Sequence, residues 1–312
     1  MPVGRVSDSL RYLGLVPQYN ALLSRQIDVQ TQIASGKKYQ RSDENPLDVG
    51  LGQLFSADIS RLEQNLRNID EVQAFTTMTD STINNALQYM QRAKELAVMG
   101  GDGSKSDADR ANIANEVDQL LRGVIEMGAT KYHGRFIFSG TETKTPAFAA
   151  VTSGTGQIIG VAYAGDGGTL DTEFTPGTTI TYNLLGSDEA GGTSGVFRDS
   201  TAGVDLFQSL IDLRDNLTAN PAALGANLAQ ITNDISHLTS AAAANGGIQN
   251  RLSFTADLHR DQTIALSEAA SKLVDTDLAA AISELQVLRT AYEASLNVGA
   301  RVNSISLLDF LR

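Results

Sequence analysis

The sequence contains no cysteine and no tryptophan, and aromatic residues make up only 6% of its 312 residues. Without cysteine, the chain has neither disulfides nor thiolate ligands for a metal. Few aromatic side chains argue against a thick globular core, because rings contribute much of the buried area in such cores. The chain also lacks a run of about 18 apolar residues, so we expect no helix that spans a membrane. These absences favour an elongated protein built from thin helical bundles.

Positive charge is also scarce. Lys and Arg number 24 against 36 Asp and Glu, which gives a net charge of −12. A protein that binds nucleic acid or an anionic membrane presents a basic face. We therefore expect neither nucleic acid nor a membrane among the partners.

Motifs for catalysis or for cofactor binding are missing as well. The histidines are His133, His237 and His259, and no two of them stand four residues apart as a helical zinc pair would. The sequence has no phosphate-binding loop of the Walker type and no GxSxG nucleophile turn. We expect the histidines to lie in solvent or at the edge of a core. The prediction is a protein that is not an enzyme, with no catalytic, cofactor-binding or metal site and no cofactor.

Apolar residues at helical spacing mark both ends of the chain. Near the C-terminus they are Leu278, Ile282, Leu285, Leu288, Tyr292, Leu296, Val302, Ile305 and Leu308. Near the N-terminus they are Val6, Leu10, Leu13, Leu23, Ile27 and Ile33. Two one-sided helices at opposite ends predict a terminal coiled coil, or a surface built for neighbouring copies. Pro17 should disturb the first helix, and Gly36 is placed as its C-cap.

Long heptad seams predict further helices between these ends. One runs from near Asp48 to about Met99, and another begins at Ser106, whose hydroxyl suits an N-cap. Helix returns at about Val204 and continues through a seam between residues 224 and 238. A further long helix follows Asn245 and the two glycines after it. Such helices predict a rod.

The middle of the chain has a different character, since 14 of the 28 glycines lie between residues 134 and 203. Short β-prone runs alternate there with turns, at residues 135–138, 158–163, 170–174 and 178–184. The segment 134–200 carries 3 basic and 7 acidic residues, which suits an outer, solvent-facing domain. We therefore expect the helices to fold without it.

The predicted fold is mainly α, with three parts. Residues 1–46 and 276–312 form an inner coiled-coil domain. Residues 47–133 and 204–275 form a helical rod domain. Residues 134–203 form an inserted, small β-rich outer domain.

Several local runs resemble the bacterial flagellin superfamily, and in particular its hook-associated protein 3 family at the hook–filament junction. These runs are ASGKK at 34–38 with SDENP at 42–46, SDADR at 106–110, GRFIFSG at 134–140 with PAF at 146–148, NRL at 250–252, DTD at 275–277 and SLL at 306–308. The matches cover both helical arms and the entry to the β-rich segment. The fold expected from this resemblance is a flagellin-like long-helix rod with a terminal coiled coil.

The resemblance implies an extracellular structural subunit of the bacterial flagellum, secreted through the flagellar type III export apparatus. The implied role is an adaptor that forms a ring of copies at the hook–filament junction, between hook-associated protein 1 and the flagellin filament. A flagellar export chaperone would bind the C-terminal helix, with Leu285, Leu288, Tyr292 and Leu296 as candidate contacts. The alternative is a short filament flagellin, although flagellins carry an NSAKDDAAG-type run where this chain has SDENP.

Overall fold

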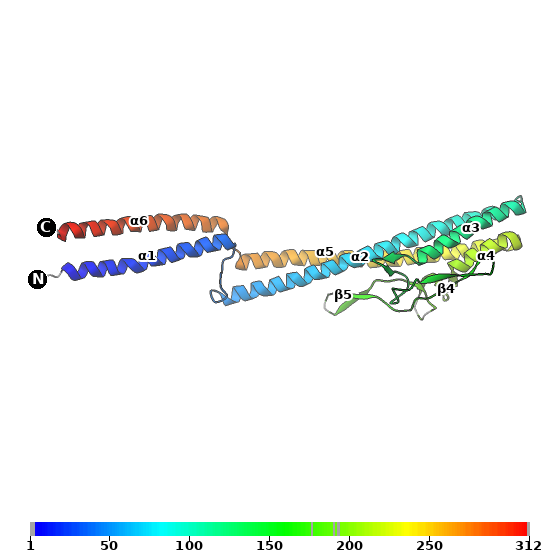
Figure 1. The fold of residues 1–312 in the computed structure, drawn as a ribbon, viewed down its shortest axis with the longest axis horizontal. Coiled ribbons are helices and arrows are strands. Elements are labelled where there is room, and N and C mark those ends of the chain that lie inside the picture. Colours follow the sequence, from blue (N-terminus) through cyan, green and yellow to red (C-terminus); the bar gives the residue numbers. More distant parts are fainter. Residues whose placement is uncertain (1–3, 176, 190, 192–193, 311–312) are drawn as a thin grey trace. The chain divides into compact units, whose positions relative to one another are not determined.

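The computed structural model describes residues 4–310 except 176, 190 and 192–193, and it describes side chains only between residues 16 and 298. Its α-helices are α1 (Gly4–Ser35), α2 (Pro46–Gly100), α3 (Asp107–Gly128), α4 (Leu206–Ala219), α5 (Leu224–Val274) and α6 (Leu278–Phe310), with a 3-10 turn at Pro221–Ala223. The strands are β1 (Lys131–Tyr132), β2 (Arg135–Phe136), β3 (Phe148–Thr152), β4 (Ile158–Tyr163), β5 (Asp171–Thr175), β6 (Thr178–Thr181), β7 (Leu185–Ser187), β8 (Gly195–Asp199) and β9 (Val204–Asp205). The expected mainly α fold with an inserted strand-rich region is confirmed (Figure 1).

The chain forms two compact units. Unit 1 comprises residues 1–62 and 261–312, and unit 2 comprises residues 63–260. Both α2 and α5 contribute residues to each unit. All of the strands fall within unit 2, together with α3 and α4. The three-part division expected from the sequence stays a prediction.

Helix α1 passes through Pro17 without interruption, so the disturbance expected there is wrong. Proline removes one backbone donor, and Pro17 is exposed, so water can solvate the carbonyl that loses its partner. The predicted C-cap is confirmed. Gly36 adopts a φ of 70°, and its amide donates to the carbonyl of Gln32 at 2.9 Å.

Helix α2 begins at Pro46, where the missing amide costs nothing because first-turn amides have no helical partner. The Asn45 side chain accepts from the amide of Asp48 at 3.2 Å and caps this end. Ser106 caps α3 as predicted, in a capping box with Asp109. The hydrogen bond from Ser106 lowers the pKa of the Asp109 carboxyl.

Two helix boundaries differ from those that the sequence indicates. The helix expected from Val204 onward breaks at Asn220 and Pro221, because proline cannot continue the hydrogen-bond pattern of α4. In contrast, α5 runs straight through Asn245 and its two glycines. Asn245 is fully buried and donates through Nδ2 to the carbonyl of Thr76 at 2.9 Å, so tertiary packing overrides the low helix propensity of this run.

The core of unit 2 joins the strands to the helices. Phe138, Phe148 and Phe197 from the strand region form a ring cluster with Phe207 of α4, and the Phe148 and Phe207 ring centroids lie 4.7 Å apart. The same apolar cluster includes residues of α2, α3 and α4. Gly128 of α3 permits this packing, since a Cβ there would lie 2.5 Å from the Phe148 ring. The strand region therefore shares its core with the helices, which argues against the expectation that the helices fold without it.

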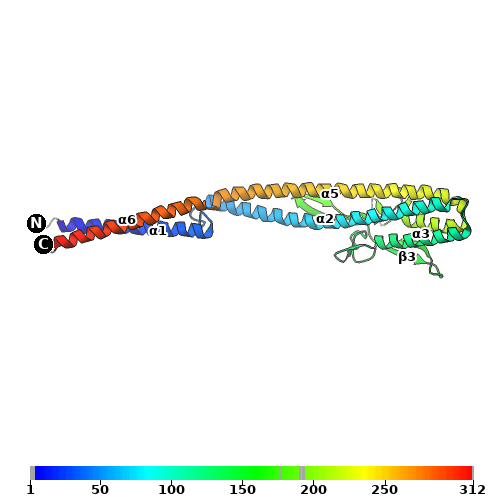
Figure 2. The ribbon, with the colours of Figure 1, turned by 90° about the horizontal axis from the view of Figure 1, so that it is seen from above.

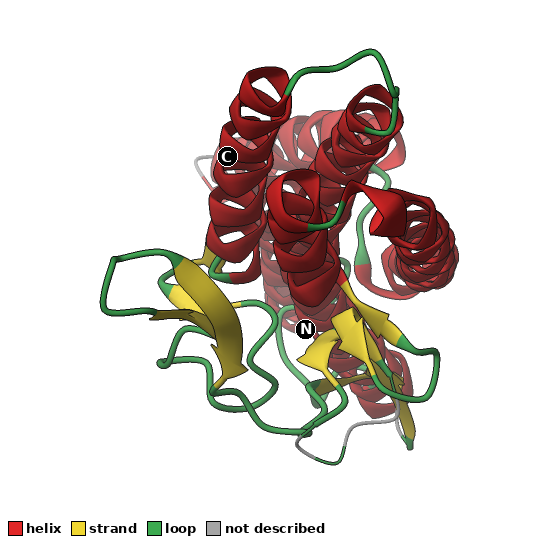
Figure 3. Ribbon diagram, turned by 90° about the vertical axis from the view of Figure 1, so that its right-hand side faces the viewer, coloured by secondary structure: helices red, strands yellow, loops and turns green. Residues whose placement is uncertain are grey.

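The strands form small separate sheets on one side of the helices (Figure 3). β1–β2, β3–β4 and β5–β6 are antiparallel pairs, and β8 pairs in parallel with β7 and antiparallel with β9. The β5–β6 pair is tied to the helices at the carbonyl of Phe174. That oxygen accepts from Asn65 of α2 at 2.8 Å and lies 2.8 Å from Nε2 of His259 in α5.

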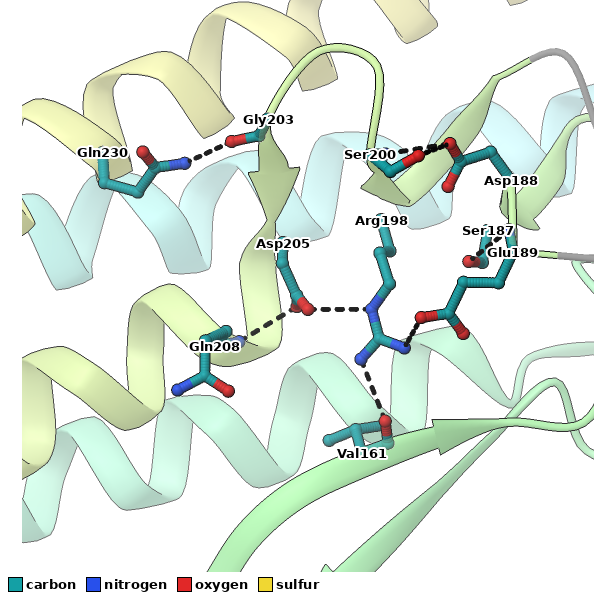
Figure 4. A network of polar contacts seen from close by, with 10 residues as sticks. All are labelled: Val161, Ser187, Asp188, Glu189, Arg198, Ser200, Gly203, Asp205, Gln208 and Gln230. Atoms are coloured by element: carbon teal, nitrogen blue, oxygen red, sulfur yellow. Dashed lines mark hydrogen bonds and ion pairs between the residues drawn. The ribbon is translucent and has the colours of Figure 1, made fainter.

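Arg198 of β8 holds three segments of unit 2 together (Figure 4). Its guanidinium donates to Asp205, the N-cap of α4, at 2.8 Å and to Glu189 at 2.9 Å. It also donates to the backbone carbonyl of Val161 in β4 at 2.9 Å. The planar fork of arginine suits this task because it presents several donors in fixed directions.

Candidate assembly site

The predicted assembly site lies in unit 1, where α1 and α6 pack side by side (Figures 1 and 2). The two helices are antiparallel, because contacts join Tyr19 to Ser295, Arg25 to Glu284 and Lys37 to Asp275. The ends of the chain therefore pair with each other, as the periodicity of the sequence indicates.

The contact face of α1 repeats every three or four residues. Val29 at its centre is fully buried, with 0% of its surface exposed. The half-buried members of this face are Tyr19, Leu22, Gln26 and Ile33. The spacings of 3, 4, 3 and 4 residues along this set are those of a coiled-coil seam. On α6 the facing residues are Ala281, which is buried, and the half-buried Leu285, Leu288, Tyr292 and Ser295.

Polar contacts border this seam. The guanidinium of Arg25 lies 2.7 Å from the carboxylate of Glu284, and the Tyr19 hydroxyl donates to the carbonyl of Ser295. Arg25 and Glu284 are both largely exposed, and exposed ion pairs contribute at most about 1 kcal/mol. Apolar burial along the seam therefore contributes more than these ion pairs to the pairing.

A short backbone bridge closes the seam at the ends of α1 and α5. The amide of Lys38 donates to the carbonyl of Val274 at 2.8 Å, and the amide of Thr276 donates to the carbonyl of Gly36 at 2.9 Å. The Lys37 ammonium lies 2.8 Å from the Asp275 carboxylate, and this hydrogen bond lowers the pKa of Asp275. The bridge sets which residues of α1 and α6 lie opposite one another.

The predicted site residues divide into three groups. Ile33, Leu285, Leu288 and Tyr292 are half-buried at the α1–α6 contact. Exposed members are Leu23, Ile27, Leu278, Ile282 and Leu296. The side chains of Val6, Leu10, Leu13, Val302, Ile305 and Leu308 lie outside the described residues. The role of all of them in assembly stays a prediction.

The predicted site omits Tyr19, Leu22 and Val29, which lie on the contact face of α1. Their seam was detectable as a repeat of 3 and 4 residues, but polar Gln26 occupies one of its positions. The exposed residues chosen in their place, Leu23 and Ile27, lie along a neighbouring stripe of the same helix.

The exposed apolar residues of α1 and α6 lie in stripes beside the α1–α6 contact. On α6, Leu278, Ile282 and Leu296 lie on one side of the contact face, and Val287 and Val298 lie on the other. On α1, the matching stripe is Val16, Leu23 and Ile27, and Ile27 is 53% exposed. Among its described side chains, α6 thus has exposed apolar residues on both sides of the face that α1 covers. A helix with so wide an apolar arc is typical of a buried position among several neighbours.

The described residues offer no group of three or more metal-binding side chains. Of the predicted core-edge histidines, His237 lies 2.7 Å from the carbonyl of Gly195 and His259 is buried against Phe174. Among the described helices, none combines the length and the apolar character that crossing a membrane requires.

Comparison with family models shows two matches. Residues 20–143 match the bacterial flagellin N-terminal helical region, and residues 228–311 match the bacterial flagellin C-terminal helical region. Together these segments cover more than half of the chain. They contain half of α1, all of α2, α3 and α6, and most of α5.

Individual relatives match along nearly the whole chain. The flagellar hook-associated protein 3 of Escherichia coli is 23% identical, over 88% of this chain and 90% of its own length. A flagellin of Listeria innocua is 20% identical, over 88% of this chain and 87% of its own. Among solved structures, a flagellar hook-associated protein from Vibrio parahaemolyticus matches with a TM-score of 0.65 at 17% identity, over 75% of this chain and 100% of that one. The last likeness concerns the fold alone.

Proposed function

Because the chain belongs to the flagellin superfamily, whose members are structural proteins, we propose that it is the adaptor subunit at the hook–filament junction of the bacterial flagellum. The observation that carries this proposal is the match to hook-associated protein 3, which extends over 88% of the chain and so includes the strand-rich segment between the helical arms. Residues 134–148 of that segment also contain the GRFIFSG and PAF runs that resemble the junction family.

The exposed stripes of α1 and α6 support an assembly role. Each copy has more apolar surface on these helices than its own pairing covers, and neighbouring copies in a ring would cover the rest. Burying one such leucine or isoleucine completely contributes roughly 1.5–3 kcal/mol. A ring forms when each copy contacts the next head to tail, because the two contacting surfaces then differ. The faces toward hook-associated protein 1 and toward flagellin must differ for the same reason.

The C-terminal helix would serve a second partner before export. Leu285, Leu288 and Tyr292 face α1 in the folded chain, so a chaperone that binds them must hold α6 apart from α1. Export through the flagellar type III apparatus requires an unfolded chain, and such a chaperone would prevent premature pairing of the ends. The adaptor would then act outside the cell, as part of the flagellum.

A strain that lacks the gene tests the adaptor role. We expect hooks without filaments, no motility, and unpolymerised flagellin in the medium, with filaments restored by the wild-type gene. Filaments of normal length in the deletion strain would contradict the proposal.

The second candidate function is a short filament flagellin, favoured by the Listeria innocua flagellin that matches over the same share of the chain. Purified flagellin grows on copies of itself, so long homopolymers of the purified chain would support this alternative. An adaptor should add few copies and stop.

A further inference from the structure

Among the residues that the structure describes, none pairs with the outer edge of strand β3. β3 and β4 form a sheet of two strands, so β3 has a partner on one side alone. Phe148, at the start of β3, is buried against the helices, whereas residues 149–152 are exposed on both faces. Figure 2 shows β3 on the outer side of α3. The exposed part of this strand is therefore open to a second strand.

The backbone of β3 alternates between its partner and this free edge. The amide of Ala164 donates to the carbonyl of Ala147 at 2.8 Å, so this pair and every second pair after it are hydrogen-bonded. Ala150 stands opposite Val161, in a pair that is not hydrogen-bonded. Its amide and carbonyl thus point away from β4. Within the described part of the chain, no group bonds to the backbone of Ala150 on that side.

The opposite edge of the same sheet, formed by β4, has a side-chain donor. The carbonyl of Val161 points outward from β4, and it accepts from the guanidinium of Arg198 at 2.9 Å (Figure 4). The fold thus supplies a donor for the outer edge of β4 and leaves the outer edge of β3 open. An exposed strand edge of this kind is a template for pairing with another chain.

This edge also lacks the charges that commonly prevent such pairing. Residues 145–165 contain no charged side chain, although the chain as a whole carries 60 of them and a net charge of −12. The outer face of the hairpin is apolar, with Val151 45% exposed and Ile159 54% exposed. Pro146 and a bulge after Val151 limit the open edge to a few residues, so the pairing should be weak.

We propose that β3 is a pairing edge for a second copy of this chain, with the two β3 strands antiparallel about Ala150. An extended strand is the occupant that fits, because only a strand offers alternating amides and carbonyls at this spacing. A second copy is favoured because acidic copies repel each other elsewhere and can approach across this uncharged hairpin. Each copy also supplies the same edge, as a two-fold contact requires.

In this register Ala150 of one copy lies opposite Ala150 of the other, in a hydrogen-bonded pair. The amide of each residue donates to the carbonyl of the other. The contact is two-fold, unlike the head-to-tail contacts of a ring, so it concerns the free chain and does not rest on the proposed function.

Single cysteines test this register in the full-length chain, which has no cysteine of its own. Opposed Cα atoms in a hydrogen-bonded antiparallel pair lie about 5.5 Å apart, within the range of a disulfide. The variant A150C should form a disulfide dimer under mild oxidation with copper phenanthroline. The variant T152C should form it about ten-fold more slowly, because its opposite residue in this register is Phe148. The variant T179C, exposed on β6, is the control for random collision.

A second substitution tests the surface itself. Adding V151K to A150C should lower the rate of dimer formation to that of T179C, while circular dichroism shows an unchanged helical fold. Non-reducing electrophoresis over time measures each rate. Equal rates of disulfide dimer formation for A150C, T152C and T179C would overturn the proposal. This holds if all three dimerise through the helical ends, and also if none of them forms a dimer. An A150C rate that V151K leaves unchanged would overturn it too.

Discussion

Asp234 of α5 should weaken unit 2 at neutral pH, and D234N should reveal by how much. The side chain is 0% exposed, and its Oδ2 has no hydrogen-bond partner within the described residues. Its Oδ1 accepts from Gln230 at 3.2 Å. Burial raises the pKa of Asp234 to about 6 from 3.8, the negative charge of Asp205 adds to this effect, and His237 and the hydrogen bonds from Ser209 and Gln230 oppose it.

The size and the sign of the effect follow from this shift. A carboxyl with a raised pKa in the folded state favours folding when it is protonated, so its contribution is complete below about pH 4. That contribution is lost as the pH rises toward 6, and the charged form then destabilises the fold at every higher pH. A shift of about two pKa units corresponds to about 3 kcal/mol. Asparagine carries no charge at any pH, so D234N should have a free energy of unfolding up to about 3 kcal/mol higher than wild type above pH 6. An amide without a hydrogen-bond partner would reduce this gain by about 1–3 kcal/mol.

Urea unfolding of wild type and D234N between pH 4 and pH 8 measures this difference. The free energy of unfolding of D234N minus that of wild type should rise between pH 4 and pH 6 and then level off. Changes common to both proteins cancel in this difference. The matched control is D212N, an exposed aspartate on α4, whose difference from wild type should not follow that curve. A D234N difference that stays constant across this range would refute the reasoning.

Other predictions concern the core and the paired ends. F197A should lower the free energy of unfolding by about 3–5 kcal/mol, because Phe197 is fully buried in the cluster shared by strands and helices; an unchanged melting temperature would contradict that shared core. L285D with Y292D should abolish chaperone binding and junction assembly, and unchanged affinity in calorimetry would place the chaperone site elsewhere. K37A should cost less than about 1 kcal/mol, because Lys37 and Asp275 are both well exposed, and a larger loss in urea unfolding would show that the bridge depends on this pair.

Helix positions were the most predictable feature of the chain. Their apolar residues recur with the helical period, and their ends carry side chains that complete local hydrogen bonds. Ser106 and Gly36 are such ends, and both act as the sequence indicates. Strands β4, β5 and β6 were also detectable, because turn residues flank short β-prone runs there. Strands β3, β7 and β8 were missed, and β7, at Leu185–Ser187, is too short to show an alternating pattern.

In two places, tertiary packing overrides what the local sequence indicates. Asn245 and its glycines predict a break, but the buried amide of Asn245 is held by the carbonyl of Thr76 on α2. The net negative charge of residues 134–200 and the many glycines of residues 134–203 suggest a separate, solvent-facing domain. The structure instead packs their phenylalanines against α4. Such contacts join distant segments, so no local window of sequence contains them.

The candidate assembly site was predictable as a pair of helices but not as a set of residues. In the structure the two ends of the chain pair, and periodicity identifies an apolar stripe on each of them. It does not say which side of a wide stripe meets its partner, so Leu23 and Ile27 were selected where Tyr19, Leu22 and Val29 make the contact.

By itself, the sequence determined that this is a mainly α protein with paired ends and a strand-rich insertion. These features follow from the spacing of apolar residues and from capping side chains, both of which are local. The tertiary structure decided which face of α6 meets α1, which strands share a core with the helices, and which edge of the β3–β4 sheet stays open. These depend on the bridge at Gly36 and Thr276 and on the donors of Arg198. In each case a backbone group forms a hydrogen bond with a residue distant along the chain, and that bond exists only in the folded protein.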